Sequence, residues 1–188
     1  MLKASEDGNS IKATVIVPVY NNPKGIETLI HALLAQTYPR QDFEIIVADN
    51  DSTDHTSDVI RTIALANDKV RLVNEDAIQS SYAARNRGIE ESSGAILAFI
   101  DSDCTPEESW LENGIEALES EDAACGGGRV EFTYQSERPN AVEYLDSARK
   151  LDQRHYVEDM GFAATANFFA RRELFERHGL FRSDVISG

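Results

Sequence analysis

Four apolar, β-branched runs alternate with helical patterns, and this alternation most restricts the folds open to the chain. The runs have the length and composition of buried strands, and they span residues 15–19, 43–49, 70–73 and 95–100. Between them, apolar residues recur three and four positions apart, as in Ile26, Leu29, Ile30, Leu33 and Leu34. Strands that alternate with helices form parallel β-α-β units. We therefore predict an α/β fold with a mostly parallel, doubly wound sheet flanked by helices.

Local signals refine the ends of these elements. Pro18 places the last part of the first strand at an edge or exit position. Ser52, Thr53 and Asp54 are suited to starting the second helix. The third helix is expected over residues 81–94, with a glycine near its end. Residues 105–108, with the sequence TPEE, resemble a capping box with proline at the first helical position of the fourth helix.

The rhythm changes after Ala123, which predicts a more irregular second half. Residues 129–134 alternate in polarity, as a strand with one solvated face does. Gly126 to Arg129, before it, predict a close backbone approach or a bend. A helical stripe follows Pro139, at Val142, Leu145, Ala148 and Leu151. We expect a flexible lead-in over residues 1–12, one half over 13–125, and a second half over 126–188.

The fourth strand ends in two aspartates, Asp101 and Asp103, separated by Ser102. In open α/β sheets, ligands bind beyond the carboxyl ends of the strands. A bend there can bring both carboxylates around one oxygen-preferring ion, and Mg²⁺ or Mn²⁺ suits such a site together with substrate phosphates. The ordinary alternative is that both are turn or cap residues before the next helix.

Polar residues at the same expected edge are further candidates. Asp49 and Asn50 follow the second strand and are suited to a hydrogen bond with a base or a ribose hydroxyl, whereas a capped polar loop is the alternative. Arg85 and Arg87 lie near the start of the third helix, where an arginine meets phosphate or forms a solvated ion pair.

Composition excludes several classes of function. A formal net charge of −15 argues against nucleic acid and against a polybasic membrane anchor. Two cysteines indicate no disulfide framework, and the four histidines have no metal-like spacing. No apolar run approaches the ~20 residues of a membrane span, and the first ten residues do not resemble a signal peptide. A cytoplasmic protein without a transmembrane segment is the expectation.

The motifs together resemble one known family. VIVPVYN, EIIVADNDSTD, AARNRGI, AFIDSD and TANFFARRELFERHGLF follow one another at the intervals seen in family 2 glycosyltransferases, over residues 14–188. The resemblance implies the GT-A fold, which is Rossmann-like. It also implies inverting transfer of a sugar from a nucleotide-diphospho-sugar donor to the hydroxyl of a glycan, polysaccharide or lipid-linked acceptor. It places the protein in the cytoplasm, peripheral at the inner membrane face.

The same resemblance assigns roles to residues. Asp103 is the more direct ligand of Mn²⁺ or Mg²⁺, and Asp101 faces the ribose or donor sugar, with Ser102 between them in the donor site. Arg85 matches an arginine near the nucleotide. Residues 161–171 shape the donor-sugar and acceptor side. The base pocket is assigned to the residues after the first two strands, namely Pro18, Val19, Tyr20, Asp49 and Asn50. The family often carries two aspartates where this chain has Asp49-Asn50, which weakens the case for uridine.

The general base of the family is not matched. It belongs to a Glu-Asp pair that follows an SG dipeptide, and this sequence ends at Gly188, so we expect a truncation there. Asp152, Glu158 and Asp159 are weak substitutes. A non-catalytic nucleotide-sugar-binding module or an inactive fragment is therefore the alternative function. A receiver-like domain would need a lysine after a later strand, and a nucleotidyltransferase a glycine-rich basic loop after the first. Neither feature is present.

Overall fold

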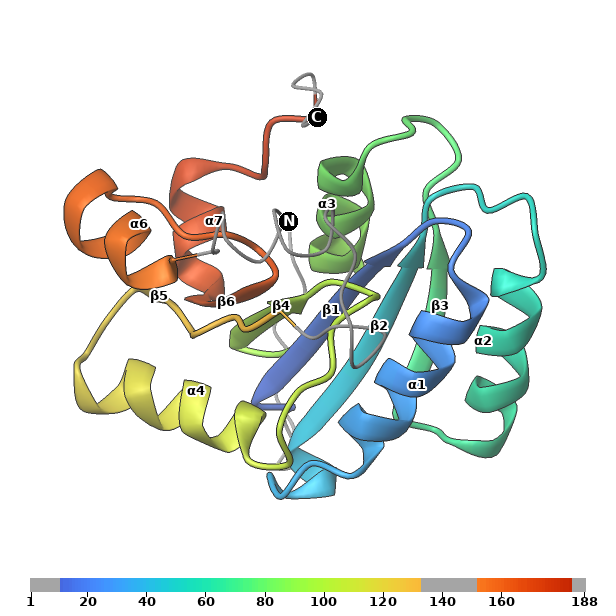
Figure 1. Ribbon diagram of the computed structural model, residues 1–188, viewed down its shortest axis with the longest axis horizontal. Coiled ribbons are helices and arrows are strands. Elements are labelled where there is room, and N and C mark those ends of the chain that lie inside the picture. Colours follow the sequence, from blue (N-terminus) through green and yellow to red (C-terminus); the bar gives the residue numbers. More distant parts are fainter. Residues whose placement is uncertain (1–10, 133–151, 184–188) are drawn as a thin grey trace, which may run out of the picture.

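The computed structural model of the protein describes residues 11–132 and 152–183. A six-stranded sheet forms its centre, in the order β3-β2-β1-β4-β6-β5 (Figure 1). The strands are β1 (Ala13–Val19), β2 (Phe43–Asp49), β3 (Val70–Asn74), β4 (Ile96–Ile100), β5 (Cys125–Gly127) and β6 (Asn167–Arg171). Strands β1 to β4 pair in parallel, and β6 pairs antiparallel with both β4 and β5. The predicted mostly parallel α/β sheet is confirmed.

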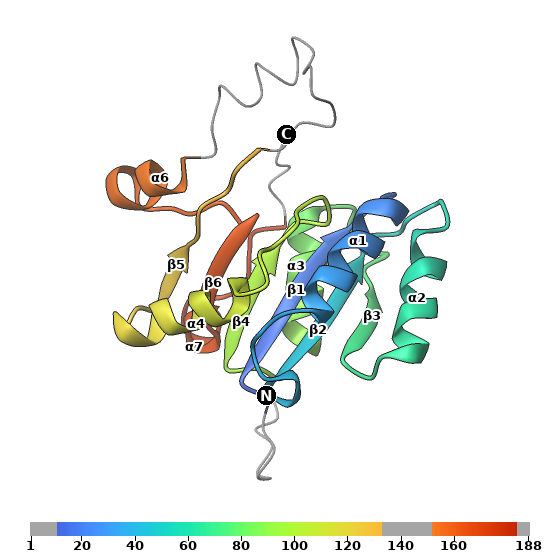
Figure 2. The ribbon, with the colours of Figure 1, turned by 60° about the horizontal axis from the view of Figure 1, so that its bottom comes forward.

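Helices cover both faces of this sheet. They are α1 (Pro23–Leu34), α2 (Thr56–Ala66), α3 (Ser81–Glu91), α4 (Trp110–Ser120), α6 (Gln153–Met160) and α7 (Arg172–His178), with a 3-10 turn at Arg40–Asp42. One apolar cluster joins α1, α2 and α4 to the sheet, and a second joins α3 and α7 to its other face. Figures 1 and 2 show α1 and α2 on one side and α3 on the other. This is the predicted doubly wound arrangement.

The two central strands explain why the sequence is apolar without alternation there. Every residue of β1 and β2 is buried, as parallel strands covered on both faces require. Pro18 lies beyond Ile16, the last residue of β1 that pairs with β4, so its missing N–H costs no bond to that strand. The expected exit position of Pro18 agrees with this pairing.

The predicted capping box over residues 105–108 is wrong, because α4 begins only at Trp110. The buried side chain of Gln36 replaces it. Its Nε2 donates to the carbonyl of Glu107 at 2.8 Å, and its Oε1 accepts from the backbone N–H of Leu111 at 2.9 Å. Helix α2 likewise begins later than its start signals, at Thr56, whose N–H is bound by the side chain of Asp54.

The strand predicted over residues 129–134 is also wrong in its described part, because Arg129 to Phe132 form no strand. The strand lies earlier, in the glycine run of β5, and the predicted close approach is confirmed there. A Cβ on Gly128 would lie 2.3 Å from Nδ2 of Asn167, and one on Gly127 would lie 3.0 Å from Cβ of Ala163. The helix predicted between Pro139 and Leu151, the strand's end at Tyr134 and most of the lead-in fall outside the described residues.

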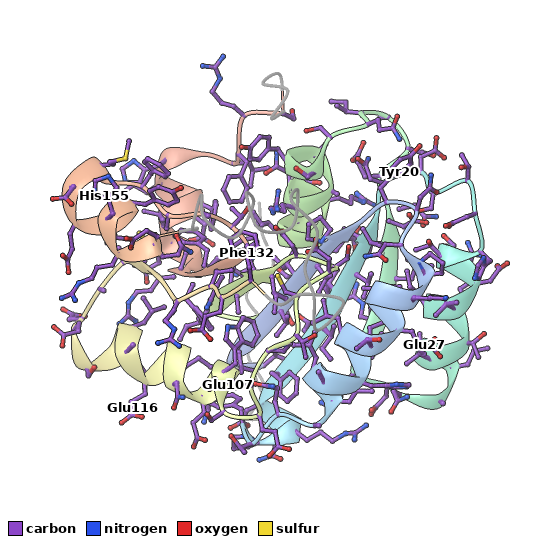
Figure 3. The ribbon with its side chains drawn as sticks, in the orientation of Figure 1. Tyr20, Glu27, Glu107, Glu116, Phe132 and His155 are labelled. Atoms are coloured by element: carbon purple, nitrogen blue, oxygen red, sulfur yellow. The ribbon has the colours of Figure 1, made fainter. Side chains whose placement is uncertain are left out.

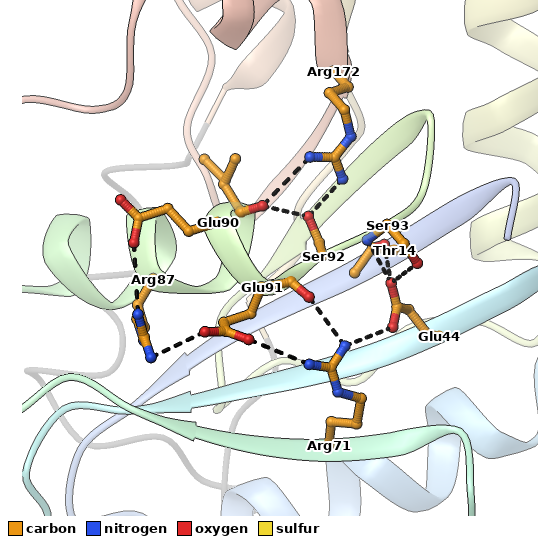
Figure 4. A network of polar contacts seen from close by, with 10 residues as sticks. Thr14, Glu44, Arg71, Arg87, Glu90, Glu91, Ser92, Ser93 and Arg172 are labelled. Carbon is orange, nitrogen blue, oxygen red and sulfur yellow. Dashed lines mark hydrogen bonds and ion pairs between the residues drawn. The ribbon is translucent and has the colours of Figure 1, made fainter. Parts of the chain in front are cut away.

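Two adjacent arginines at the end of β6 fasten the helices on opposite faces of the sheet. Arg171 donates from Nη2 to the carbonyl of Leu118, in the last turn of α4, at 3.4 Å. Arg172 donates from Nε to the carbonyl of Gly94 at 2.7 Å, just after α3. Its Nη2 donates to Oγ of Ser92 at 2.6 Å (Figure 4). Cations near helix C-termini satisfy end carbonyls and oppose the helix dipole. Inserting β6 between β4 and β5 therefore ties together both helical layers.

No helix in the described part of the chain has the length and apolar character needed to cross a membrane.

A buried carboxylate closes the amino-terminal end of the sheet. Glu44, at the start of β2, is 7% exposed and accepts hydrogen bonds from Thr14 at 2.9 Å and from the backbone of Ser93 at 2.8 Å. Arg71 lies 3.2 Å from its second oxygen and also contacts Glu91 (Figure 4). Burial by itself raises the pKa of Glu44, but these hydrogen bonds and the charge of Arg71 outweigh it and hold that pKa below its ordinary value.

We expect Glu44→Gln to lower the free energy of unfolding by about 1–3 kcal/mol at neutral pH, because a charged acceptor becomes a neutral amide. The pKa of Glu44 is depressed in the folded chain. Its stabilisation is therefore present above the ordinary value of 4.5 and is lost as the pH falls through the folded pKa. Denaturant titrations across this pH range should show the two proteins converging in acid.

Glu90→Gln is the matched control, because Glu90 belongs to the same network but its side chain is 53% exposed and lies 3.8 Å from Arg87. It should change stability by roughly 0.5 kcal/mol or less. A difference between wild type and Glu44→Gln that is the same at every pH would contradict the titration of Glu44 as its cause.

Candidate functional site

The loops after β1, β2 and β4 meet at one edge of the sheet, because these strands are parallel and adjacent. Val19 pairs with Asp49, and the N–H of Asn50 donates to the carbonyl of Val19 at 2.9 Å. Ser102, after β4, lies within hydrogen-bond distance of Asn22, after β1. The structure therefore brings together the three groups of residues that the sequence placed at the ligand edge.

Asp101, Ser102 and Asp103 form a tight turn. The N–H of Cys104 donates to the carbonyl of Asp101 at 3.0 Å, which closes the turn around Ser102 and Asp103. Asp103 is exposed, and its recorded side-chain contact is the thiol of Cys104 at 3.8 Å. Burial, with the charges of Asp103 and Asp101, raises the pKa of the Cys104 thiol to about 12, so this thiol stays protonated. Asp103 is thus the carboxylate of the pair that is open to solvent.

Asp101 is held by an arginine. Nη2 of Arg85, on α3, lies 2.6 Å from Oδ1 of Asp101, and the side chains of the two residues are 5% and 36% exposed. The guanidinium also lies over the ring of Tyr82, 5.8 Å from its centroid. The Nε of Arg85 is buried and has no hydrogen-bond partner within the described residues. Arg85 therefore places a nearly buried positive charge directly beneath the turn.

Asp49 and Asn50 are buried, and their polar atoms are engaged by neighbouring loops. Asp49 accepts from the N–H and hydroxyl of Ser52 and from the hydroxyl of Ser57. Nδ2 of Asn50 donates to the carbonyls of Glu75 at 3.0 Å and Ile78 at 2.8 Å, which fixes the loop between β3 and α3. An aspartate could not make these two bonds, since it has no donor when ionised. Contact of either residue with a base stays a prediction.

The three residues expected to line the base pocket differ in exposure. Pro18 and Val19 are buried, and Val19 belongs to the main apolar cluster. Tyr20 is 47% exposed and lies beside the loops beyond β1 (Figure 3). Of this predicted set, Tyr20 therefore presents the exposed side chain, and Pro18 and Val19 support the backbone beneath it.

Sequence reasoning missed two consecutive asparagines after β1. Asn21 adopts a positive φ of 47°, and its Oδ1 accepts from the N–H of Thr53 at 2.8 Å. Asn22 caps α1 and donates from Nδ2 to both the carbonyl and the hydroxyl oxygen of Ser102 at 3.2 Å. The signal for the cap was present, since an asparagine directly before proline is typical of a helix start. The contact with Ser102, 80 positions away, left no trace in local sequence.

Few side chains at this edge could ligate a metal ion. Among the described residues, no three or more histidines, cysteines or carboxylates are grouped so as to hold an ion. The pair Asp101 and Asp103 offers carboxylate oxygens, of which one is shared with Arg85. Such a set fits Mg²⁺ or Mn²⁺, which take few protein oxygens and complete their shell with water and phosphate.

The stretch over residues 161–171 is fixed by a buried amide. Gln153 is 4% exposed, and its Nε2 donates to the carbonyls of Ala164 at 2.9 Å and Asn167 at 3.0 Å. Its Oε1 accepts from the N–H of Ala164 at 2.8 Å. Oδ1 of Asn167 in turn accepts from the indole of Trp110 at 2.9 Å. This network joins α6, β6 and α4 beside β4. It fixes the surface formed by Gln153 and Asn167, which is called the wall below.

The three carboxylates of α6 offered as substitute bases have local partners. Asp152 caps the helix through the N–H of His155 at 3.2 Å. Glu158 lies 3.0 Å from Nε of Arg154, and Asp159 lies 2.7 Å from Nδ1 of His155. His155 projects from the outer side of α6 (Figure 3). Helix capping and exposed ion pairs account for these contacts, and none of them indicates a role as base.

Comparison with known proteins gives a consistent result. The model of "Glycosyl transferase family 2" matches residues 14–179. Glycosyltransferase AglE of Haloferax volcanii is 42% identical over 178 residues, which are 93% of this chain and 57% of that protein. Glycosyltransferase GlyG of Streptococcus pneumoniae is 29% identical over 70% of this chain and 43% of its own length. The chain thus spans about half the length of the curated relatives it matches.

Solved structures with a similar fold include the mannosyltransferase PcManGT from Pyrobaculum calidifontis in complex with GDP-Man and Mn²⁺. Its TM-score is 0.73 at 26% identity, over 93% of this chain and 48% of that one. S. aureus TarS 1-349 in complex with UDP gives a TM-score of 0.73 at 19% identity, over 94% of this chain and 52% of that one. At that identity the second likeness speaks for the fold alone, which is the predicted GT-A fold.

We expect Arg85→Met to lower the free energy of unfolding by about 2 kcal/mol, because it leaves the half-buried carboxylate of Asp101 without its partner. Asp101→Asn and the double variant complete a cycle whose coupling energy measures the pair. Denaturant titration of the four proteins gives each value.

Arg87→Met is the matched control, because Arg87 lies on the same helix but its ion pair with Glu91 is between side chains 40% and 34% exposed. Its effect should stay near 0.5 kcal/mol. Additive effects of Arg85→Met and Asp101→Asn would show that the two residues do not interact as the geometry indicates.

Proposed function

The chain belongs to glycosyl transferase family 2, and on that premise we propose that it transfers a sugar, with inversion, from a nucleotide-diphospho-sugar to an acceptor hydroxyl. The observation that carries the proposal is the turn of Asp101, Ser102 and Asp103. It sits at the carboxyl edge of a GT-A sheet, next to the loops after β1 and β2. This is the crevice where doubly wound sheets bind nucleotides.

The donor is proposed to lie across this edge. Tyr20, the backbone of Pro18 and Val19, and the loops fixed by Asp49 and Asn50 would border the base. Ser102 and the two aspartates would meet the ribose, the diphosphate and the sugar. A net charge of −15 makes local cations necessary for binding a diphosphate, and Arg85 supplies one. The Pyrobaculum mannosyltransferase was solved with GDP-Man, which supports the donor class without choosing the base.

Mn²⁺ or Mg²⁺ is the proposed cofactor, with Asp103 as the direct ligand. The carboxylate of Asp103 is exposed and free of charged partners in the described part of the chain, whereas Asp101 shares one oxygen with Arg85. When bound, the cation offsets the charge of the diphosphate and stabilises it as a leaving group. The complex of the Pyrobaculum enzyme with Mn²⁺ supports the choice of Mn²⁺.

The reaction is a direct displacement at the anomeric carbon. The acceptor oxygen forms a bond to that carbon, the bond to the diphosphate oxygen breaks, and the hydroxyl proton passes to a base. Attack opposite the leaving group inverts the configuration. We assign the base to no described residue, since the α6 carboxylates serve as a cap and in exposed pairs. The wall built on Gln153 and Asn167 is proposed to border the donor sugar and acceptor.

Acceptor and location rest on the family alone. We propose a glycan or lipid-linked acceptor, met at the cytoplasmic face of the membrane. Residues 13–125 are proposed to hold the nucleotide, and residues 126–188 the donor-sugar and acceptor side.

We expect Asp103→Asn to remove most of the Mn²⁺-dependent affinity for nucleoside diphosphates, by ten-fold or more, on the order of the effects seen when metal ligation is disturbed. The substitution keeps the shape of the side chain but removes its charge. Calorimetric titration of UDP, GDP and their sugars, with and without Mn²⁺, measures the change.

Glu116→Gln is the control, because Glu116 is an exposed carboxylate on α4 and its loss changes the net charge equally (Figure 3). It should bind as the wild type does. Equal Mn²⁺ dependence in Asp103→Asn and wild type would refute the metal role of Asp103. A wild type that binds no nucleotide sugar with either metal would refute the function.

A further inference from the structure

Asn22 joins two functional elements that are far apart in sequence. Its Oδ1 accepts from the N–H of Gly25 at 3.1 Å, which caps α1. Its Nδ2 donates to the carbonyl oxygen and to Oγ of Ser102, both at 3.2 Å. A backbone N–H can only donate, so the contact with Gly25 identifies the oxygen of the amide. The donor end must therefore face Ser102.

The neighbourhood of Asn22 leaves its side chain little freedom. A Cβ on Gly25 would lie 2.2 Å from Nδ2, 2.6 Å from Oδ1 and 2.7 Å from Cγ of Asn22. Any side chain at position 25 would thus displace the amide. The glycine at the third helical residue, which lowers helix propensity, is explained by the space that Asn22 occupies.

The contact acts on the middle of the proposed metal-binding turn. The bond from the N–H of Cys104 to the carbonyl of Asp101 joins the two ends of the turn, and Arg85 holds the carboxylate of Asp101. The carbonyl of the peptide between Ser102 and Asp103 takes part in neither contact. Asn22 binds the carbonyl of that peptide, so it sets the direction in which Asp103 leaves the turn.

We propose that Asn22 is a positioning residue, which holds the Asp101-Ser102-Asp103 turn in the conformation that binds a divalent cation. This rests on the proposed function, because it concerns the same metal site. Residues that orient metal ligands through hydrogen bonds commonly change affinity 10- to 100-fold when they are altered. Since the amide of Asn22 only donates to Ser102, the hydroxyl hydrogen of Ser102 also stays available to an acceptor on the nucleotide.

Two substitutions remove the contact in different ways. Asn22→Ser keeps a good helix cap but is too short to reach Ser102, so α1 should retain its stability to within a few tenths of a kcal/mol, as known for exchanges between good caps. Gly25→Ala leaves both Asn22 and Ser102 in place but puts a methyl group where the amide lies. Ala also has the higher helix propensity, which works against unfolding. Agreement between the two variants isolates the contact itself.

The matched control is Thr28→Ala, at an exposed position of α1 one turn beyond Gly25. It removes the bond from the hydroxyl of Thr28 to the carbonyl of Lys24 at 3.0 Å. It changes the same helix without touching Asn22 or Ser102. We expect Asn22→Ser and Gly25→Ala to weaken Mn²⁺ binding, measured with UDP and with GDP, by about ten-fold. The control should remain within about three-fold of wild type, because a substitution that shares no partner with the Asn22–Ser102 contact acts independently of it.

Hydrogen exchange of the metal-free proteins supplies a second readout. The N–H of Cys104 closes the turn, so it should exchange about ten-fold faster in the two variants, while amides in the core strands β1 and β2 keep their protection. The inference requires both changes. Affinity that stays at the wild-type level would overturn it, and so would weaker binding without faster exchange at Cys104, because the loss would then arise elsewhere.

Failure of the positioning role of Asn22 can be told apart from failure of the proposed function. A wild type whose nucleotide binding ignores Mn²⁺ would refute the metal role, and with it the role of Asn22 toward the metal. A Mn²⁺-dependent wild type that Asn22→Ser leaves unchanged would refute the positioning role alone.

Discussion

The candidate site depends on the position of β1 between two parallel neighbours. Because β2 and β4 lie on either side of β1, the residues that follow β1 are within reach of both neighbouring loops. Asn21 binds the loop after β2, and Asn22 binds the turn after β4. Two consecutive amides therefore connect the region proposed for the base with the region proposed for the metal. The meeting of these loops at one edge is a consequence of strand order, and the two asparagines tie the loops to one another.

Buried charged groups are paired differently at the two ends of the sheet. At the amino-terminal end, the buried carboxylate of Glu44 has donors on both oxygens, from Thr14, Ser93 and Arg71. At the carboxyl end, the buried charge of Arg85 has one carboxylate partner. Its Nε, like that of Arg87 on the same helix, has no hydrogen-bond partner in the described structure. A fully paired buried group stabilises a fold, and a buried charge that is paired on one side keeps hydrogen-bonding capacity for a ligand. In a chain of net charge −15, this leaves positive charge where a diphosphate would need it.

The sequence predicted the parts of the fold that depend on local periodicity. The four parallel strands and the helices between them follow from apolar spacing, and the aspartates at the end of β4 follow from their abrupt position after a buried run. Contacts between distant residues were not predictable in this way. Gln36 accepts from the N–H of Leu111, 75 positions away, and helps to set the start of α4 there. The local capping signal of residues 105–108 therefore does not decide where the helix begins. The glycines of β5 form a strand through their pairing with Phe168 and Phe169 of β6, which lie far along the chain.

The site residues divide along the same line. Asp101, Asp103 and Arg85 were recognisable because charged groups near strand ends and helix starts are conspicuous. Asn22 was not, since its amide resembles any other helix cap until the fold brings Ser102 beside it. The difference has a physical basis. Arg85 restrains Asp101 through its charge, which can be recognised in the sequence. Asn22 restrains the backbone of the turn through a hydrogen bond, which can be recognised only in the folded chain. The two restraints act on adjacent parts of the turn and leave the carboxylate of Asp103 open, which is the arrangement that a shared cation requires.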